Sequence, residues 1–211
     1  MKLNKETVGS FLVVLFHLVG FFGFVSPCSD LFKQLVPFHL LLMFALLVIS
    51  HPDRNRNFWF FLGAIFLSGY LVELLGVHTD AIFGEYFYKT TLGVKLAEVP
   101  LLIGINWVLV IYSAGALLEE SGIKNRLVKS LLAAVLVTLL DFFIEPIAIR
   151  FDYWEWTDVT VPIQNYIGWF VVSFLMLLLF NKLRFDKENR LGTVLFITQL
   201  CFFIGLNLQV N

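Results

Sequence analysis

Two acidic residues interrupt a long apolar stretch of the chain. Asp141 and Glu145 lie four positions apart within residues 127–149, so on a helix both side chains project from the same face. A third acid, Glu73, lies near the end of another apolar run, 58–75. No Lys or Arg lies near these acids within their runs, and a carboxyl group in a low-dielectric environment keeps its proton when no cation neutralises it. The pattern indicates buried carboxyl groups that can donate a proton.

Each acid also has a structural interpretation. Asp141 can hydrogen-bond a neighbouring helix, and Glu73 and Glu145 can extend toward a membrane interface from near the ends of their runs. Glu98 comes directly before the apolar run 99–118, where it can cap the start of a helix. Because Asp141 lies deepest, it is our first candidate for a catalytic acid, followed by Glu73 and Glu145.

Two aromatic runs lie outside the apolar stretches, at 83–88 and 153–156. Both alternate aromatic residues with small or acidic ones. Their rings can line a slot for a flat apolar ligand, stabilise a cation, or belong to the aromatic belt of a membrane protein. His78, close to Glu73, can relay protons. One histidine among scattered acids is weak evidence for a metal site, so we expect no metal.

The bulk composition indicates which class of protein carries these residues. Of the 211 residues, 59% are hydrophobic and 15% are charged. Soluble domains are about 45–50% apolar and about 25% charged, so these values exclude a water-soluble enzyme, and disorder as well. The net charge of −1 implies no nucleic-acid partner. We expect one integral membrane domain over residues 1–211, with the lipid bilayer as its surroundings.

Seven apolar runs have about the length needed to cross a bilayer as helices. The sequence therefore predicts an all-α fold, a polytopic membrane helix bundle. Basic residues before the first run resemble a signal peptide, but no small-residue cleavage site follows, so we expect the first span to be retained. The expected spans are 8–25, 35–50, 58–75, 99–118, 127–149, 166–180 and 191–210.

The distribution of basic residues predicts the orientation of the bundle. Eleven Lys and Arg residues lie at the N-terminus and in the connections on its side, against four on the opposite side. By the positive-inside rule, the N-terminus is then cytoplasmic, and seven spans leave the C-terminus outside. We expect a multi-pass protein of the inner membrane of a bacterial or archaeal cell, with its acids and loop aromatics in the outer half.

Several motifs together resemble the CruF-type family of carotenoid biosynthesis membrane proteins. They occur in the same order and with the same spacing over roughly residues 70–170. The first block holds ELLGVHT (73–79), FGEYFY (83–88), LG (92–93), VP (99–100) and Trp107. The second holds DFFIEP (141–146) and YWEW (153–156), and the third is VPIQNYIGW (161–169).

The resemblance implies a cofactor-free carotenoid hydratase with a polyene substrate. Such enzymes add water to the terminal C1–C2 double bond of an acyclic ψ-end, as in lycopene, γ-carotene or bisanhydrobacterioruberin, and the product is a tertiary alcohol. Hydration of an alkene begins with a proton delivered to carbon, a role that suits Asp141. Aromatic faces then stabilise the tertiary cation, and the entry and deprotonation of water suit Glu73, Glu145 or Asn165 near the mouth of the site. The expected substrate-binding residues are Tyr86, Tyr88, Trp107, Trp154, Trp156, Asn165, Trp169 and His78.

Two other functions use the same residues. A cofactor-free carotenoid cyclase or isomerase needs the same protonation step but excludes water, and its product has an unchanged mass. A proton-coupled transporter would use the buried acids as a relay. The mass of the product separates hydratase from cyclase, and uptake into vesicles identifies a transporter.

Overall fold

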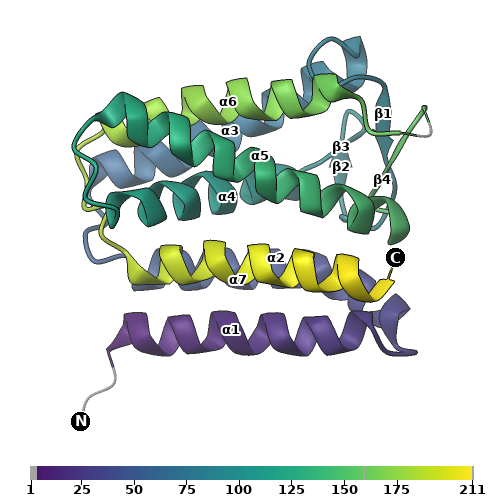
Figure 1. Cartoon of the computed structure of the whole chain (residues 1–211), viewed down its shortest axis with the longest axis horizontal. Helices are drawn as coiled ribbons and strands as arrows, with labels where there is room; N and C mark the ends of the chain where they lie inside the picture. The colour runs from purple at the N-terminus through teal and green to yellow at the C-terminus, as the bar shows by residue number, and fades with distance from the viewer. Residues whose placement is uncertain (1–3, 159, 211) are drawn as a thin grey trace.

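A computed structural model describes residues 4–158 and 160–210 of the chain. Seven long helices run side by side, and short strands lie at one end of them (Figure 1). All seven helices are long and apolar enough to cross a membrane, which confirms the predicted all-α fold and suits a multi-pass membrane protein. The helices are α1 (Lys5–Phe24), α2 (Ser29–Ser50), α3 (Arg56–Thr79), α4 (Leu102–Glu119), α5 (Arg126–Arg150), α6 (Ile163–Lys182) and α7 (Arg190–Val210).

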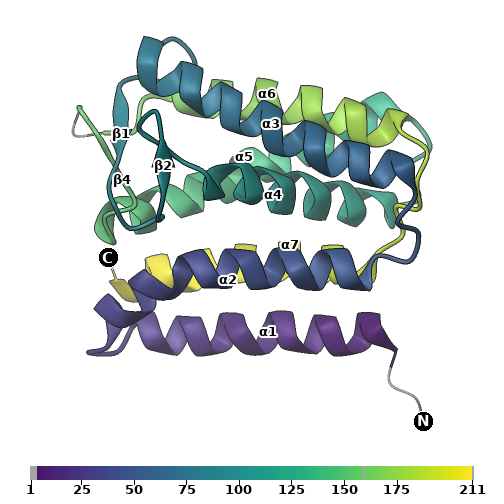
Figure 2. The same ribbon diagram turned by 180° about the vertical axis from the view of Figure 1, so that it is seen from behind.

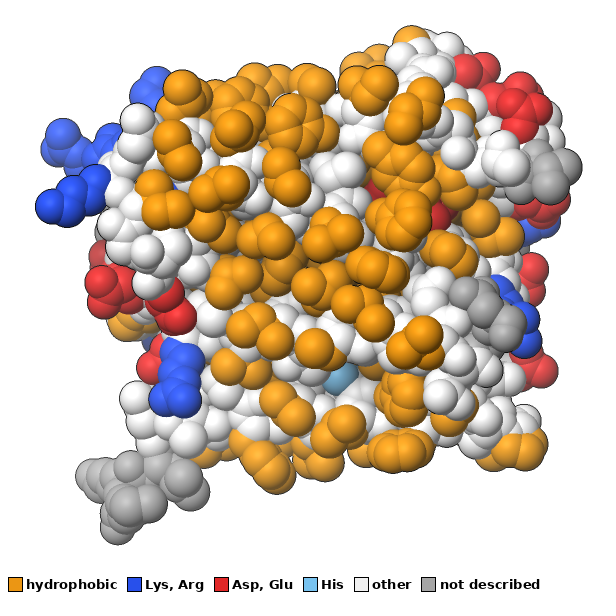
Figure 3. Space-filling view, in the orientation of Figure 1, with side chains coloured by type: hydrophobic (Ala, Val, Ile, Leu, Met, Phe, Trp, Pro, Cys, Tyr) orange, Lys and Arg blue, Asp and Glu red, His pale blue; other side chains and the backbone are white. Residues whose placement is uncertain are grey.

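Asparagines directly precede and cap four of the helices at the end of the bundle where the chain starts. The side chains of Asn4, Asn55, Asn125 and Asn189 accept hydrogen bonds from backbone N–H groups in the first turns of α1, α3, α5 and α7. These bonds satisfy donors that have no partner within the helix. In space-filling view, hydrophobic side chains cover the middle of the molecule and most charged ones lie at its two ends (Figure 3).

Four helices begin three or more residues away from the sequence prediction, and α1 and α6 each begin three residues early. α2 begins six residues before the expected span, because Lys33 in its first turns is neutralised by Asp152 at 2.7 Å. α4 begins three residues late, because Val99 and Pro100 form a strand instead. Glu98, expected to cap this helix, lies in the preceding turn with a φ of 66° and is exposed.

The aromatic loop segments form two short antiparallel ladders at the end opposite the N-terminus. β1 (Tyr86–Tyr88) pairs with β4 (Trp154–Trp156), and β2 (Lys95–Leu96) pairs with β3 (Val99–Pro100). Because successive strand side chains point to opposite faces, Tyr86 and Tyr88 lie on one face of β1 and Phe87 on the other. The tyrosines are buried and Phe87 is exposed, so the ladder presents its hydroxyls to the helices.

α4 lies at the centre of the bundle. It packs against α2, α3, α5, α6 and α7, and most of its residues are buried. Seen from behind, α3 lies over α4 on one side, while α2 and α7 lie together on the other (Figure 2). α1 packs mainly on α2 and α7, at the edge of the bundle. The central position of α4 places its outer end beside both α3 and α5, which carry the acids.

Gly168 lets α6 pack directly against the loop that follows α3. A Cβ at this position would lie 2.6 Å from the carbonyl oxygen of Ile82 and 2.9 Å from the ring of Phe83. We expect Gly168→Ala to lower the free energy of unfolding by about 1–3 kcal/mol, because backbone must move to admit the methyl group. Gly63→Ala in α3 is the matched control, since its Cβ would meet no described atom within 4 Å. Thermal unfolding in detergent compares the two variants, and equal midpoints would contradict this prediction.

Candidate active site

Three buried carboxyl groups meet at the end of the bundle that carries the short strands. Glu73 comes from α3, and Asp141 and Glu145 come from successive turns of α5. They line a small cavity, the acid cavity, together with Tyr86, Tyr88, Trp154, Asn165 and five other residues. Its volume is about 20 Å³, and a cavity of roughly 10–15 Å³ is enough for one water molecule. The predicted convergence of these acids is therefore present in the fold.

Glu73 accepts hydrogen bonds from three side chains. The hydroxyls of Tyr86 and Tyr88 donate to Oε2 at 2.6 and 2.7 Å, and the indole of Trp107 donates to Oε1 at 2.9 Å. Burial, followed by the negative charge of Glu73, raises the pKa of both tyrosines above the ordinary value. Both phenols therefore stay protonated and can donate. Two strand residues and one helix residue thus hold this carboxylate in place.

Glu145 is held in a similar way by two tryptophans. Trp154 and Trp156 lie two positions apart on β4, and their indole N–H groups donate to the same oxygen, Oε2, at 3.0 and 2.8 Å. An indole can only donate, so Glu145 must accept from both. Its other oxygen, Oε1, is only 3.4 Å from the amide nitrogen of Asn165. Glu145 thus keeps one weakly bonded oxygen toward the acid cavity.

Asp141 differs from the other two acids because one of its oxygens has no partner. Oδ2 accepts from the Asn165 amide at 2.9 Å. Oδ1 is buried and makes no hydrogen bond within the described part of the chain, and the residue is 1% exposed. When the carboxyl is protonated, its hydrogen belongs on Oδ1, since Oδ2 already faces a donor. A protonated Asp141 would therefore carry its hydrogen on an oxygen that has no hydrogen-bond partner among the described residues.

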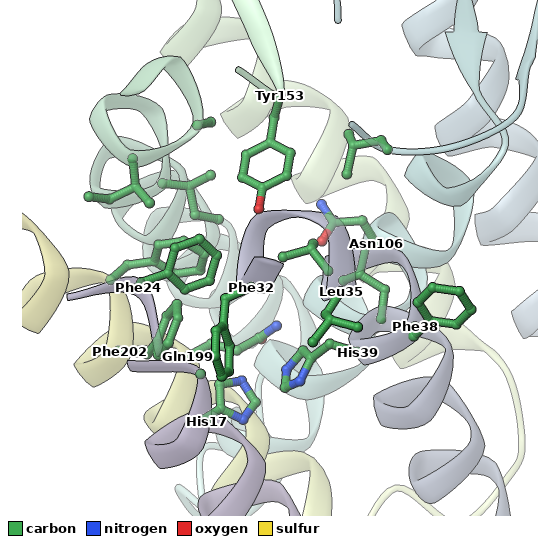
Figure 4. A pocket seen from close by; sticks show the side chains of 18 of the residues that line it. His17, Phe24, Phe32, Leu35, Phe38, His39, Asn106, Tyr153, Gln199 and Phe202 are labelled. Carbon is green, nitrogen blue, oxygen red and sulfur yellow. The ribbon is translucent and has the colours of Figure 1, made fainter. Parts of the chain in front are cut away.

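A second, much larger cavity adjoins the acid cavity. It has a volume of about 410 Å³ and lies among α1, α2, α4, α5 and α7 (Figure 4). The residues Ile103, Asn106, Ile144 and Trp154 line both cavities, so the acid cavity lies directly beside an apolar compartment. This apolar cavity was not predicted from the sequence. The only polar residue near the acids that could have indicated it is Asn106, which lies within an apolar run.

The model of the family described as carotenoid biosynthesis protein matches residues 34–211. The chain belongs to the carotenoid biosynthesis protein family. This match confirms the resemblance seen over residues 70–170 and extends it through α2 and α7.

One curated relative of this carotenoid biosynthesis protein carries a named activity. It is the bisanhydrobacterioruberin hydratase of Haloarcula japonica, 28% identical over 193 residues. The similarity covers 84% of this chain and 66% of the relative, so the chain spans just under two thirds of the relative's length. No solved structure matches the chain.

Trp107 and Trp169 form a stacked pair behind the acids of this carotenoid biosynthesis protein. Their ring centroids are 4.1 Å apart with an angle of 14° between the planes. Trp169 lines the acid cavity, while Trp107 is fully buried and holds Glu73. Trp107, expected to bind substrate, is therefore placed to position a carboxylate, and Trp169 is placed to meet a ligand.

Two outer-loop residues considered from sequence lie apart from the acid cavity. His78 is exposed, and its Nε2 hydrogen-bonds the carbonyl oxygen of Ala97 at 3.2 Å. This bond links the end of α3 to the turn between β2 and β3, the same turn that contains Glu98. Neither residue lines the acid cavity or the apolar cavity. The fold thus brings together every expected site residue except His78.

Proposed function

We propose that this protein is a carotenoid hydratase that adds water to the terminal C1–C2 double bond of an acyclic carotenoid. The unpartnered Oδ1 of Asp141 carries the proposal, because Asp141 lines a cavity with room for one water next to an apolar cavity. The named activity of the Haloarcula japonica relative and the family assignment support the same reaction. The chemistry needs no cofactor, since alkene hydration transfers no electrons.

The first step is proton transfer from Asp141. The terminal alkene enters from the apolar cavity past Ile103 and Ile144, which line both cavities. The hydrogen on Oδ1 moves to C2 as the π bond breaks, which leaves a tertiary cation at C1 and a carboxylate at Asp141. Because the hydrogen bond from Asn165 is already made to Oδ2, it also stabilises the carboxylate that forms.

The second step captures the cation with water. The held carboxylates of Glu73 and Glu145 provide negative charge, and the rings of Tyr86 and Trp154 provide π faces next to C1. Water forms the C1–O bond and releases its extra proton to Oε1 of Glu145, the oxygen with the weakest hydrogen bond. Asn165 contacts both acids, so the proton can return to Asp141 within one cluster and restore the starting state.

The site favours hydration over cyclisation for a geometric reason. A cyclase must keep water away from the cation, whereas here the space beside the acids is the size of one water. Three acids and two amides are among the residues that line it, which supplies the several polar partners that an ordered water needs. Hydration is thus the reaction that uses this space.

The orientation follows from the charge distribution. We infer a cytoplasmic N-terminus and an external C-terminus, with the acid cavity in the outer half of the bilayer of a bacterial or archaeal inner membrane. Most Lys and Arg residues lie in or beside the connections between α2 and α3, α4 and α5, and α6 and α7, at the N-terminal end of the bundle. The strands β1 and β4, whose side chains bond the acids, lie at the opposite end (Figure 1). Water then reaches the site from outside the cell.

Expression in bacteria that accumulate an acyclic carotenoid tests the activity. We expect lycopene, γ-carotene or bisanhydrobacterioruberin to be converted to a more polar pigment that is heavier by one water, measured by chromatography and mass spectrometry. Cells with an empty vector are the control. An isomer of unchanged mass would identify a cyclase, and unchanged pigments from all three substrates would contradict the proposed activity.

A further inference from the structure

The apolar cavity has a polar corner formed by three residues from three helices. His17 of α1, His39 of α2 and Gln199 of α7 line it, and Figure 4 shows their side chains directed into the cavity. The rings of His17 and His39 are in edge contact, with centroids 4.6 Å apart. His17 also contacts Phe202, one turn beyond Gln199 on α7. This polar corner has no role in the proton transfers proposed above.

Hydrogen-bond acceptors in the polar corner lack donors. The amide oxygen of Gln199 is buried without a partner in the described residues, and the side chain is only 7% exposed. His17 Nδ1 donates to the carbonyl oxygen of Val13 at 2.8 Å, so in a ring with one proton Nε2 is left as an acceptor. Buried polar atoms normally have partners, so these acceptors indicate a ligand that brings a donor.

The remaining walls of the cavity restrict what that ligand can be. No Lys, Arg, Asp or Glu is among the residues that line the apolar cavity, so nothing there would neutralise a phosphate, carboxylate or ammonium group. The other lining residues are almost all aliphatic or aromatic. A hydroxyl group on a hydrocarbon fits both features, because it donates one hydrogen bond, accepts others, and carries no charge.

The apolar cavity also reaches the lipid-facing surface. Phe16 of α1 and Leu35 and Phe38 of α2 line it, yet these side chains are 38%, 42% and 67% exposed. The opening therefore lies between α1 and α2, on the face that meets the bilayer. A ligand that enters here comes from the membrane, and a polyene too long for the cavity can extend back through the same opening.

We propose that the polar corner binds a hydroxyl group on the carotenoid whose terminal double bond lies beside the acid cavity, an inference that rests on the proposed function. At 1.5 Å per residue, Gln199 and His17 lie roughly 5–9 Å nearer the N-terminal end of the bundle than Asp141. The hydroxyl then belongs to the same half of the polyene as the reacting bond. The preferred substrate is thus an oxygenated acyclic carotenoid, and an unsubstituted hydrocarbon such as lycopene is bound more weakly.

Binding and turnover are measured with two polyenes that differ by one hydroxyl. The purified protein in detergent is titrated with lycopene and with a monohydroxylated acyclic carotenoid, and quenching of tryptophan fluorescence reports Kd, since Trp154 lines the cavity. We expect the hydroxylated polyene to bind about 10-fold more tightly, and Gln199→Leu to reduce that preference to about 1–3-fold. His17→Phe, which keeps the ring contacts, should weaken the preference similarly.

Gln209→Leu is the matched control, because it makes the same chemical change at an exposed position of α7. It should leave the preference unchanged. The hydroxyl site would be refuted if the wild-type protein bound both polyenes with the same Kd, or if Gln199→Leu weakened the binding of both polyenes equally. The polar corner would then hold an ordered water. If the wild-type protein binds the hydroxylated polyene more tightly but hydrates neither polyene, the proposed hydratase activity is refuted and the hydroxyl site is retained.

Discussion

Asp141→Asn is expected to abolish hydration while the protein still folds. General acid catalysis contributes about 10²–10⁴-fold to rate, and an amide cannot deliver the proton that starts this reaction. The fold should survive because the asparagine oxygen can still accept from Asn165 in place of Oδ2, and its amide would occupy the position of the unpartnered Oδ1. Conversion of the carotenoid per amount of protein in membranes measures the loss, and thermal unfolding in detergent measures stability.

Asp152→Asn is the control for this experiment. Asp152 lies at the same end of the molecule, but it is exposed and paired with Lys33, which lowers the pKa of its carboxyl. Its replacement should leave hydration unchanged. A well-folded Asp141→Asn protein with full activity would remove Asp141 as the acid, and Glu145, the other acid that Asn165 bonds among the described residues, would be the next candidate.

The helices and the acid cluster could be predicted from sequence for simple reasons. A span needs about 20 apolar residues, and that signal is strong enough to locate all seven helices within a few residues. The spacing of Asp141 and Glu145 fixes them on one helix face whatever the tertiary structure is. Glu73 follows because α3 and α5 run in the same direction, so acids toward their C-terminal ends lie at the same end of the bundle.

The partners of these acids could not be predicted in the same way. β1 and β4 are three residues each and lie 65 residues or more apart in sequence, so no local pattern pairs Tyr86 with Trp156. That pairing decides which donors reach Glu73 and which reach Glu145. The apolar cavity is harder still to predict from sequence, because its walls come from five helices and its shape depends on how their side chains pack.

Glu73→Leu is expected to have the largest effect on stability. The substitution leaves the hydroxyls of Tyr86 and Tyr88 and the indole N–H of Trp107 buried without their acceptor. Each orphaned donor costs about 1–3 kcal/mol, so the free energy of unfolding should fall by roughly 3–9 kcal/mol. Glu85→Leu removes an exposed acid next to Tyr86 and should change stability little. If both variants unfold at the same temperature, the three hydrogen bonds do not hold the ladder to the helices.

Glu73→Gln separates the charge of this residue from its hydrogen bonds. The glutamine oxygen can still accept from Trp107, and a tyrosine hydroxyl can turn to accept from the new amide, so the protein should stay folded. The negative charge beside the cation is lost, however, and we expect hydration to fall by about 10-fold or more. Pigment analysis of the variant in carotenoid-producing cells measures this loss. A Gln variant with wild-type turnover would show that Glu73 only positions Tyr86, Tyr88 and Trp107, and the negative charge near C1 would then come from Glu145 alone.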